Sequence, residues 1–136
     1  MNGVICKAAP LSILLAVCTF TSAPVQAQTS STDRSECMQK AIDSSNPAQQ
    51  IIALGRAVNL ARQAAEAANG GLSKYQADAS MHGPASIAPC VDNGDGTWTF
   101  TVKGGKPGFT TPTQETIVNV DGNTWKVSIV SNGPIR

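Results

Sequence analysis

The chain has 136 residues, of which 41% are apolar, 4% aromatic and 14% charged. This composition excludes a disordered, collagenous or coiled-coil chain and predicts a globular protein whose core is built mainly from Ala, Val, Ile and Leu. Ten Lys and Arg residues stand against nine Asp and Glu residues, so no basic excess points to a nucleic-acid partner. The length admits one small domain and excludes a two-domain enzyme.

Residues 1–27 have the pattern of a secretory signal peptide. Lys7 precedes an apolar run over 11–20, which is shorter than the roughly 20 apolar residues that a membrane-spanning helix needs. Small side chains before the expected cut predict cleavage after Ala27. The polar stretch 28–32 is then a disordered leader. The mature protein is therefore expected to be secreted or periplasmic, with no transmembrane segment.

Two alternatives attach the protein to a membrane instead. The signal could stay uncleaved as an anchor, or Cys18 could be acylated, because Leu15 stands three residues before it as in bacterial lipoprotein signals. Val17 argues against acylation, since a β-branched residue beside the cut fits that signal poorly. An acylated Cys18 would leave the protein tethered rather than free.

The mature chain keeps two of the four cysteines, Cys37 and Cys90. In an oxidising compartment, two cysteines permit one disulfide bond. A bond between them would close the loop from residue 37 to residue 90, which stabilises a protein by roughly 4 kcal/mol in the chain-entropy model. A redox-active or metal-binding pair is the alternative, but the chain has no Cys-x-x-Cys spacing and only one histidine.

Residues 33–136 are predicted as one small α+β domain that begins with two helices. Asp33, with Glu36 three residues later, is typical of a helix start and predicts a short helix over 34–44. Asn46, followed by proline, is typical of the cap and first position of a second helix.

The second helix is predicted over 47–68 and ends at the Asn-Gly-Gly sequence that follows. At helical periodicity it has one broad apolar face, made largely of alanine, with Arg56 and Glu66 among the residues on the opposite face. Small side chains allow a close approach to a flat partner. We therefore expect this face to pack against a β-sheet.

Alternation of apolar and polar residues predicts the strands that follow. A weak edge strand is expected over 75–81, and an irregular segment containing a proline over 86–91. Stronger strands are expected over 97–102, 115–120 and 124–129, the first and last after turns rich in Asp, Gly and Asn.

The two tryptophans are predicted to share the buried face of the sheet. A two-residue turn at Gly122-Asn123 places Val120 opposite Trp125 and Val118 opposite Val127. The long helix is then expected to lie across a face that contains Trp98, Phe100, Trp125 and Val127. The predicted fold is α+β, with a short and a long N-terminal helix packed on an antiparallel meander of three to four strands.

No catalytic, metal or cofactor site is predicted from motifs. The turn that starts at Asp92 lacks the pattern of a calcium loop, because glycines occupy two ligand positions and Lys103 occupies the position of the bidentate glutamate. Another calcium geometry using Asp92, Asn93 and Asp95 remains an alternative. His82 is the only histidine, so no catalytic triad can be assigned, and a surface or turn role is expected for it.

The segment 103–112 is the strongest candidate for binding. It is longer than most hairpin connections and displays Lys103, Lys106 and Phe109 among Gly and Pro residues, which is typical of a contact loop on a rigid scaffold. In the alternative, Phe109 folds back onto the core and both lysines are merely solvated.

These features predict a small exported, non-enzymatic interaction module. It would bind a protein, a peptide or a cell-wall polymer through the 103–112 loop and an exposed sheet edge. A structural or accessory component of the envelope is one alternative. A small hydrolase or ligand carrier is another, and it would need a concave pocket with converging polar groups.

Overall fold

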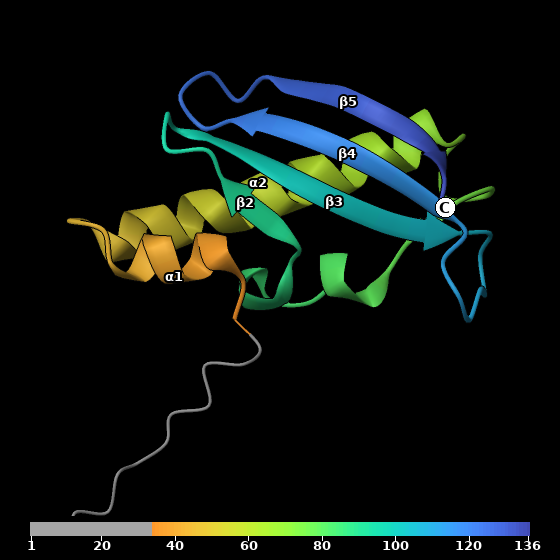
Figure 1. Cartoon of the computed structure of the whole chain (residues 1–136), viewed down its shortest axis with the longest axis horizontal. Coiled ribbons are helices and arrows are strands. Elements are labelled where there is room, and N and C mark those ends of the chain that lie inside the picture. Colours follow the sequence, from red (N-terminus) through yellow and green to blue (C-terminus); the bar gives the residue numbers. More distant parts are fainter. Residues whose placement is uncertain (1–33) are drawn as a thin grey trace, which may run out of the picture.

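The computed structural model describes residues 34–136 and contains two helices followed by an antiparallel sheet (Figure 1). Helix α1 spans Glu36–Ile42 and helix α2 spans Pro47–Ala68. The predicted signal peptide, leader and Cys18 acylation site lie outside the described residues and stay predictions. The predicted order of a short helix, a long helix and an antiparallel sheet is confirmed.

The sheet has five strands rather than the predicted three to four, because two short strands pair with the same neighbour. β3, β4 and β5 form the main meander, and β1 and β2 both pair with the outer edge of β3. The strands are β1 Gln76–Ala77, β2 Cys90–Asp92, β3 Thr97–Gly105, β4 Gln114–Asp121 and β5 Val127–Pro134. Two 3₁₀ helices, η1 (Ala79–Met81) and η2 (Ala85–Ile87), lie between β1 and β2.

The bounds of the helices follow from their caps. α1 is shorter than predicted because the side chain of Ser35 accepts a hydrogen bond from the Met38 backbone N–H, so this serine caps the first turn. α2 has the predicted bounds, with Pro47 at its first position. Asn46 precedes it without a side-chain cap.

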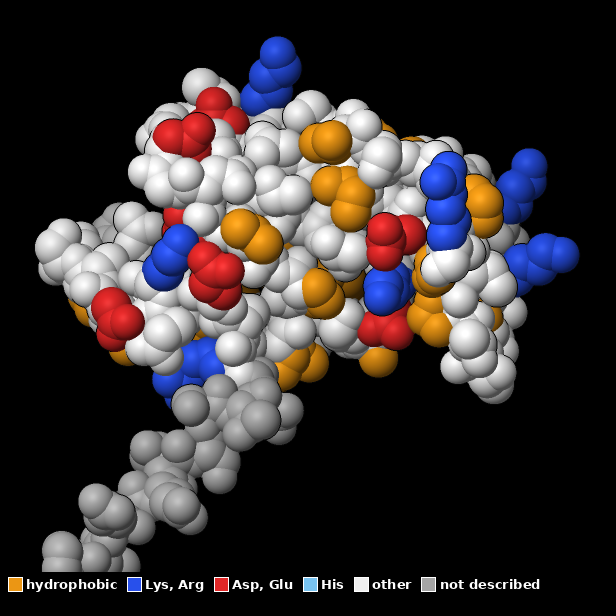
Figure 2. All heavy atoms as spheres, viewed as in Figure 1, with side chains coloured by type: hydrophobic (Ala, Val, Ile, Leu, Met, Phe, Trp, Pro, Cys, Tyr) orange, Lys and Arg blue, Asp and Glu red, His pale blue; other side chains and the backbone are white. Residues whose placement is uncertain are grey.

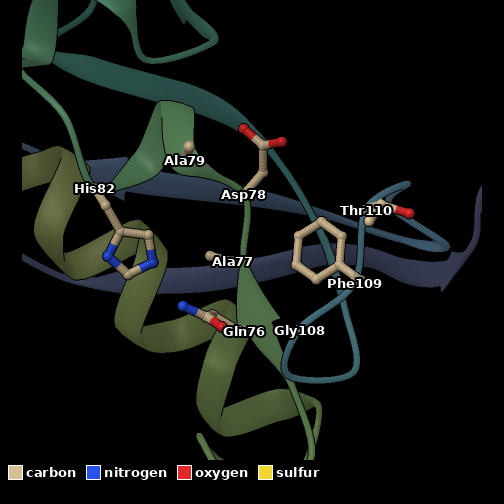
Figure 3. Close-up of a pocket in the computed structure, with 8 residues that line it drawn as sticks. All are labelled: Gln76, Ala77, Asp78, Ala79, His82, Gly108, Phe109 and Thr110. Carbon is tan, nitrogen blue, oxygen red and sulfur yellow. The ribbon is translucent and has the colours of Figure 1, made fainter.

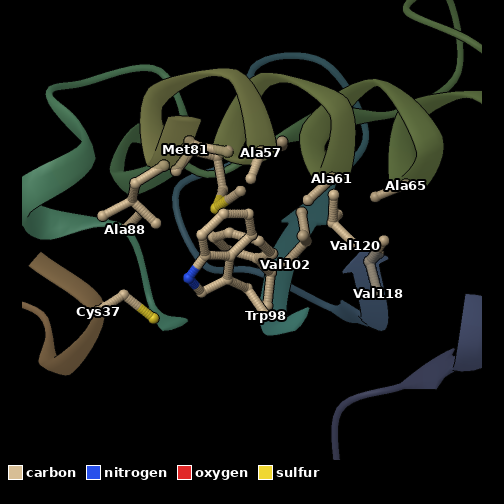
Figure 4. Packing of buried hydrophobic residues seen from close by; sticks show 14 of the residues in the cluster. Cys37, Ala57, Ala61, Ala65, Met81, Ala88, Trp98, Val102, Val118 and Val120 are labelled. Carbon is tan, nitrogen blue, oxygen red and sulfur yellow. The ribbon is translucent and has the colours of Figure 1, made fainter. Parts of the chain in front are cut away.

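The alanine face of α2 lies across β3 and β4, as predicted (Figure 4). Ala57, Ala61 and Ala65 are fully buried, and so are the side chains of the sheet that oppose the helix. Because alanine adds little bulk, the helix can come close to the flat sheet and exclude water from this layer. The sheet side chains buried there include Trp98, Phe100, Val102, Val118 and Val120.

The predicted register of the last hairpin is wrong. Val120 pairs with Val127, and Val118 pairs with Ile129. The turn is wider than two residues because the Asp121 carboxylate accepts hydrogen bonds from the backbone N–H groups of Asn123 and Thr124, two and three residues further along the chain. This turn displaces Trp125 from the strand, and its backbone adopts a φ of 61°.

Trp98 lies in the core as predicted, whereas Trp125 does not share its position. The Trp125 side chain is half-buried and packs against the edge of the core, next to Val127. The Trp125 N–H donates to the Asp121 carbonyl across 2.7 Å. The expectation that both indoles lie under the helix is therefore met fully by Trp98 and only in part by Trp125, which lies at the margin of the core and contacts α2 through Arg56.

The predicted strand over 75–81 is also wrong beyond its first residues. Only Gln76–Ala77 pairs with β3, because the Asp78 carboxylate then accepts from the Ser80 N–H and starts η1. The alternation predicted burial correctly for Tyr75, Ala77 and Met81, which are in the core, but not for Ala79, which is exposed. The side-chain cap at Asp78 turns the chain into η1 and so changes which side chains face inward.

The predicted disulfide bond between Cys37 and Cys90 is present. It joins α1 to β2, and the two Cα atoms are 5.8 Å apart. Cys37 is fully buried and Cys90 is partly buried, so the bond closes one end of the core. No helix within residues 34–136 combines the length and apolar character needed to cross a membrane.

Candidate functional site

The two edges of the sheet differ in how they are covered. On one side, β1 and β2 occupy the edge of β3, and the Lys40 ammonium group of α1 donates to the Asp92 carbonyl of β2 across 3.1 Å. On the other side, β5 pairs only with β4 and forms the end of the sheet (Figure 1). Among the described residues, β5 is therefore the long strand with a free edge.

The side chains of β5 give this edge little protection against pairing. The strand Val127–Pro134 contains no charged residue, and Ile129 and Val130 are 41% and 65% exposed. Proteins usually block such edges with charges, prolines or bulges. In β5, two such features are present: a register shift opposite Ile117/Val118 and a proline at the last position of the strand.

The backbone of β5 has unpaired hydrogen-bonding groups on its outer side. The Lys126 carbonyl accepts from Asp121, and the Ile135 N–H donates to Thr113, so these groups point toward β4. Because alternate residues of a strand direct their N–H and C=O groups to opposite sides, Val127 and Asn132 direct theirs outward. A second extended chain could pair with these groups.

An aromatic and cationic pair lies at the start of this edge. The Arg56 guanidinium carbon of α2 is 4.0 Å from the centroid of the Trp125 ring. Ile52, one helical turn before Arg56, is 73% exposed. We call the outer edge of β5 together with Arg56, Trp125 and Ile129 the β5 edge surface. Tryptophan and arginine are the residue types that most often dominate binding energies at interfaces.

The sequence indicated an exposed sheet edge but not this surface, because Trp125 was expected in the core and Arg56 on the face of the helix opposite the apolar one. The alternating pattern over 124–129 indicated a strand but did not show that this strand would form an edge of the sheet. The Asp-Gly-Asn-Thr sequence before Trp125 was the signal that could have indicated this surface, because it favours a wider turn held by side-chain hydrogen bonds.

The structure does not bring the three predicted binding residues together. Lys103 belongs to β3, which extends to Gly105, and it pairs there with Glu115 of β4. The connecting loop therefore spans 106–113. Lys106 is exposed in that loop, and Phe109 is half-buried and packs against Gly105.

Lys103 and Phe109 line two different depressions. The depression at Lys103 has a volume of about 510 Å³ and also contains Glu115 and Arg136. The depression at Phe109 has a volume of about 420 Å³. In Figure 3, Phe109 and His82 stand on opposite sides of Ala77, and the side chains of Gln76 and Asp78 lie between them.

A buried carboxylate stands behind His82. Glu66 of α2 has a side chain that is 7% exposed; its Oε2 atom bonds to Arg62 across 3.1 Å, while Oε1 has no hydrogen-bond partner among the described residues. His82 Nε2 lies 3.7 Å from Glu66 Oε1. Burial raises the pKa of Tyr75, and the negative charges of Glu66 and Asp78 raise that pKa further.

The face of the sheet away from α2 is largely polar and uncharged. Figure 2 views the molecule from this side and shows scattered apolar side chains with acidic and basic groups interspersed. A small hydrogen-bond network covers part of it, in which the Asn93 side-chain amide donates to the hydroxyls of Thr97 and Thr99. In that view, basic side chains gather at the right-hand end of the molecule.

The predicted turn at Asp92 is held by its own carboxylates. The Asp92 side chain accepts from Gly94 N–H, and the Asp95 side chain accepts from Thr97 N–H. In the part of the chain that the structure describes, no three His, Cys, Asp or Glu side chains are grouped as a metal site.

Together, these features define a two-layer α+β protein with one long helix over an antiparallel sheet, a free edge at β5 and a depression under Phe109. Comparison of the chain with protein-family models, curated proteins and solved structures found no match. A fold does not by itself specify a function, which depends on the residues of a site and their geometry.

Proposed function

We propose that this protein is an exported, non-enzymatic interaction module that binds an extended segment of a partner protein as an added strand at β5. The observation that carries this proposal is an eight-residue edge strand without a charged residue and with two exposed apolar side chains. In strand addition, main-chain hydrogen bonds supply affinity and alternate side chains supply specificity. Export is supported by the signal-like sequence and by the disulfide bond.

The β5 edge surface also favours a particular kind of partner segment. Ile129 pairs with the buried Val118, so its side chain is on the α2 side of the sheet, where Arg56 stacks on Trp125. Side chains of an added strand that point to this side would contact Ile129 and Trp125. We therefore expect a partner segment in which apolar residues alternate with polar ones.

A library of random nine-residue peptides displayed on phage tests this proposal. Peptides selected on the immobilised protein should show alternating apolar residues. Their binding should fall at least about tenfold with Val130→Lys, because a lysine on an edge opposes pairing. Val91→Lys is the matched control, since Val91 is a similarly exposed valine (50%) on the short strand β2.

Amide exchange locates the bound peptide. Binding should slow exchange of the Val127 and Asn132 N–H groups, which have no partner on β4. Equal loss of binding with Val91→Lys, or unchanged exchange along β5, would contradict strand addition. Pairing of β5 with a second copy instead of a peptide would be seen as a dimer in sedimentation and would replace the proposed partner class.

The binding role predicted for Lys103, Lys106 and Phe109 stays a prediction. The loop 106–113 and the C-terminal end of β5 lie at the same end of the sheet, because the Ile135 N–H donates to the Thr113 carbonyl. Phe109 itself packs on the side of β1, across the sheet from β5. Its surroundings support a separate binding role.

A further inference from the structure

The depression under Phe109 has a lining that suits a small planar group. The Phe109 ring and the His82 imidazole lie on opposite sides of Ala77, and each turns a ring face toward the viewer rather than toward the other (Figure 3). The carboxylate of Asp78 and the amide of Gln76 supply hydrogen-bonding groups. An apolar floor with few converging polar groups is typical of ligand sites.

The charge of this depression is negative. Asp78 is the one formally charged side chain among the residues that line it, apart from the titratable His82. The Asp78 Oδ1 atom accepts from Ser80 N–H across 2.8 Å, so Oδ2 is the oxygen left for a ligand. Lys106 is exposed in the same loop but does not line the depression.

Glu66 places a second carboxylate next to the site, and its charge is offset in part by the ion pair with Arg62. Its side chain is more than nine-tenths buried, and Arg62 bonds to one oxygen only. The unpartnered Oε1 atom is on the side of His82, 3.7 Å from the imidazole Nε2 atom. A buried acceptor without a partner is costly, and a cationic ligand over the face of the Phe109 ring would reduce this cost electrostatically.

We infer that this depression binds a planar organic cation, of the guanidinium or amidinium class, as found on an arginine side chain. The Asp78 Oδ2 atom would accept a charge-assisted hydrogen bond from an N–H of such a group. The Phe109 ring would attract the cation through its π face. A neutral ligand of the same shape could still donate a hydrogen bond to Asp78 but would lack the charge that strengthens both interactions.

Benzamidine and benzamide separate charge from shape, because they are close in size and differ in charge. In an NMR titration of the protein, benzamidine should shift the amide signals of residues 76–82 and 108–110 in a saturable way. Benzamide should bind at least about tenfold more weakly. Equal binding of the two compounds, no saturable shift with benzamidine, or shifts confined to other residues would overturn the inference.

Variants test which residues hold the cation. Asp78→Asn removes the charge but keeps an oxygen that can accept from Ser80, and it should weaken benzamidine binding at least about tenfold. Phe109→Leu keeps an apolar side chain without the π face and should weaken binding several-fold. Glu115→Gln, at the other depression, is the matched control and should leave binding unchanged.

The inference is independent of the proposed strand addition. Val130→Lys should leave benzamidine binding unchanged, since Val130 is on β5 and the depression is beside β1. Unchanged benzamidine binding with Asp78→Asn in a variant that keeps the wild-type amide spectrum elsewhere would overturn the assignment, whatever the phage experiment shows.

Discussion

The guanidinium carbon of Arg56 lies 4.0 Å from the centroid of the Trp125 ring, although the two residues belong to different layers of the fold. Trp125 has a φ of 61° and is the one non-glycine residue with positive φ in the described part of the chain. L-residues pay about 1–2 kcal/mol in this region. The stacking and packing of the ring therefore hold a backbone conformation that glycine adopts more readily.

Replacing Trp125 separates these two effects. Both Trp125→Ala and Trp125→Gly lose the ring, but only the glycine relaxes the backbone. We expect Trp125→Gly to be more stable than Trp125→Ala by about 0.5–1 kcal/mol, because the greater flexibility of unfolded glycine offsets part of the relief. Urea unfolding measures the difference. An alanine variant as stable as the glycine variant would show that the positive φ is not a source of strain.

Gly104 is required by the close approach of β1 to β3. A Cβ atom there would clash with the Gln76 carbonyl and the Tyr75 hydroxyl. Gly104→Ala should therefore lower the free energy of unfolding by about 1–3 kcal/mol, the usual cost of overpacking. Gly133→Ala is the control, since no atom lies within 4 Å of its added Cβ. Similar unfolding midpoints for both variants would contradict the role of Gly104.

The disulfide bond should contribute a large share of the stability. The sequence separation of Cys37 and Cys90 is 53 residues, for which the chain-entropy model gives about 4 kcal/mol. The double variant Cys37→Ala/Cys90→Ala should unfold at a much lower urea concentration than the oxidised protein. Reductant should shift the wild-type midpoint in the same direction and leave that of the variant unchanged. A variant with the wild-type midpoint would contradict this prediction.

Stability should fall in acid partly through two turn carboxylates. Hydrogen bonds from Thr124 and the Asn123 backbone lower the pKa of Asp121, and hydrogen bonds from Thr97 lower that of Asp95. Because the folded-state pKa is the lower one, their contribution is present above the unfolded value of about 3.9 and is lost as pH falls through the folded-state pKa.

The variant Asp95→Asn/Asp121→Asn should therefore show a shallower loss of thermal stability than wild type as the pH falls below about 4. Thermal unfolding followed by circular dichroism at a series of pH values measures the two slopes. At pH 7 the variant should be the less stable of the two proteins, since the asparagines lack the charge that strengthens these hydrogen bonds. Parallel slopes for both proteins would contradict the stated role of the two carboxylates.

Patterns within a short stretch of sequence predicted the parts of the fold that depend on interactions between neighbouring residues. The alanine periodicity over 47–68 was sufficient for α2 and its buried face, and two remaining cysteines were sufficient for the bridge. The predictions failed where a polar side chain redirected the chain. The carboxylates of Asp78 and Asp121 each accept backbone hydrogen bonds, one starting η1 and the other widening the last turn. Such competing hydrogen bonds are hard to weigh from sequence because their net energies are small.

The order of helices and strands, the alanine-lined helix, the disulfide bond and the inward-facing residues of β3 could all be predicted from local patterns in the chain. The free edge at β5, the contact of Arg56 with Trp125, and the depression lined by Phe109, Asp78 and His82 could not. Periodicity and capping act over a few residues, whereas these three relationships depend on strand order and on the docking of α2, which bring together residues far apart in the chain.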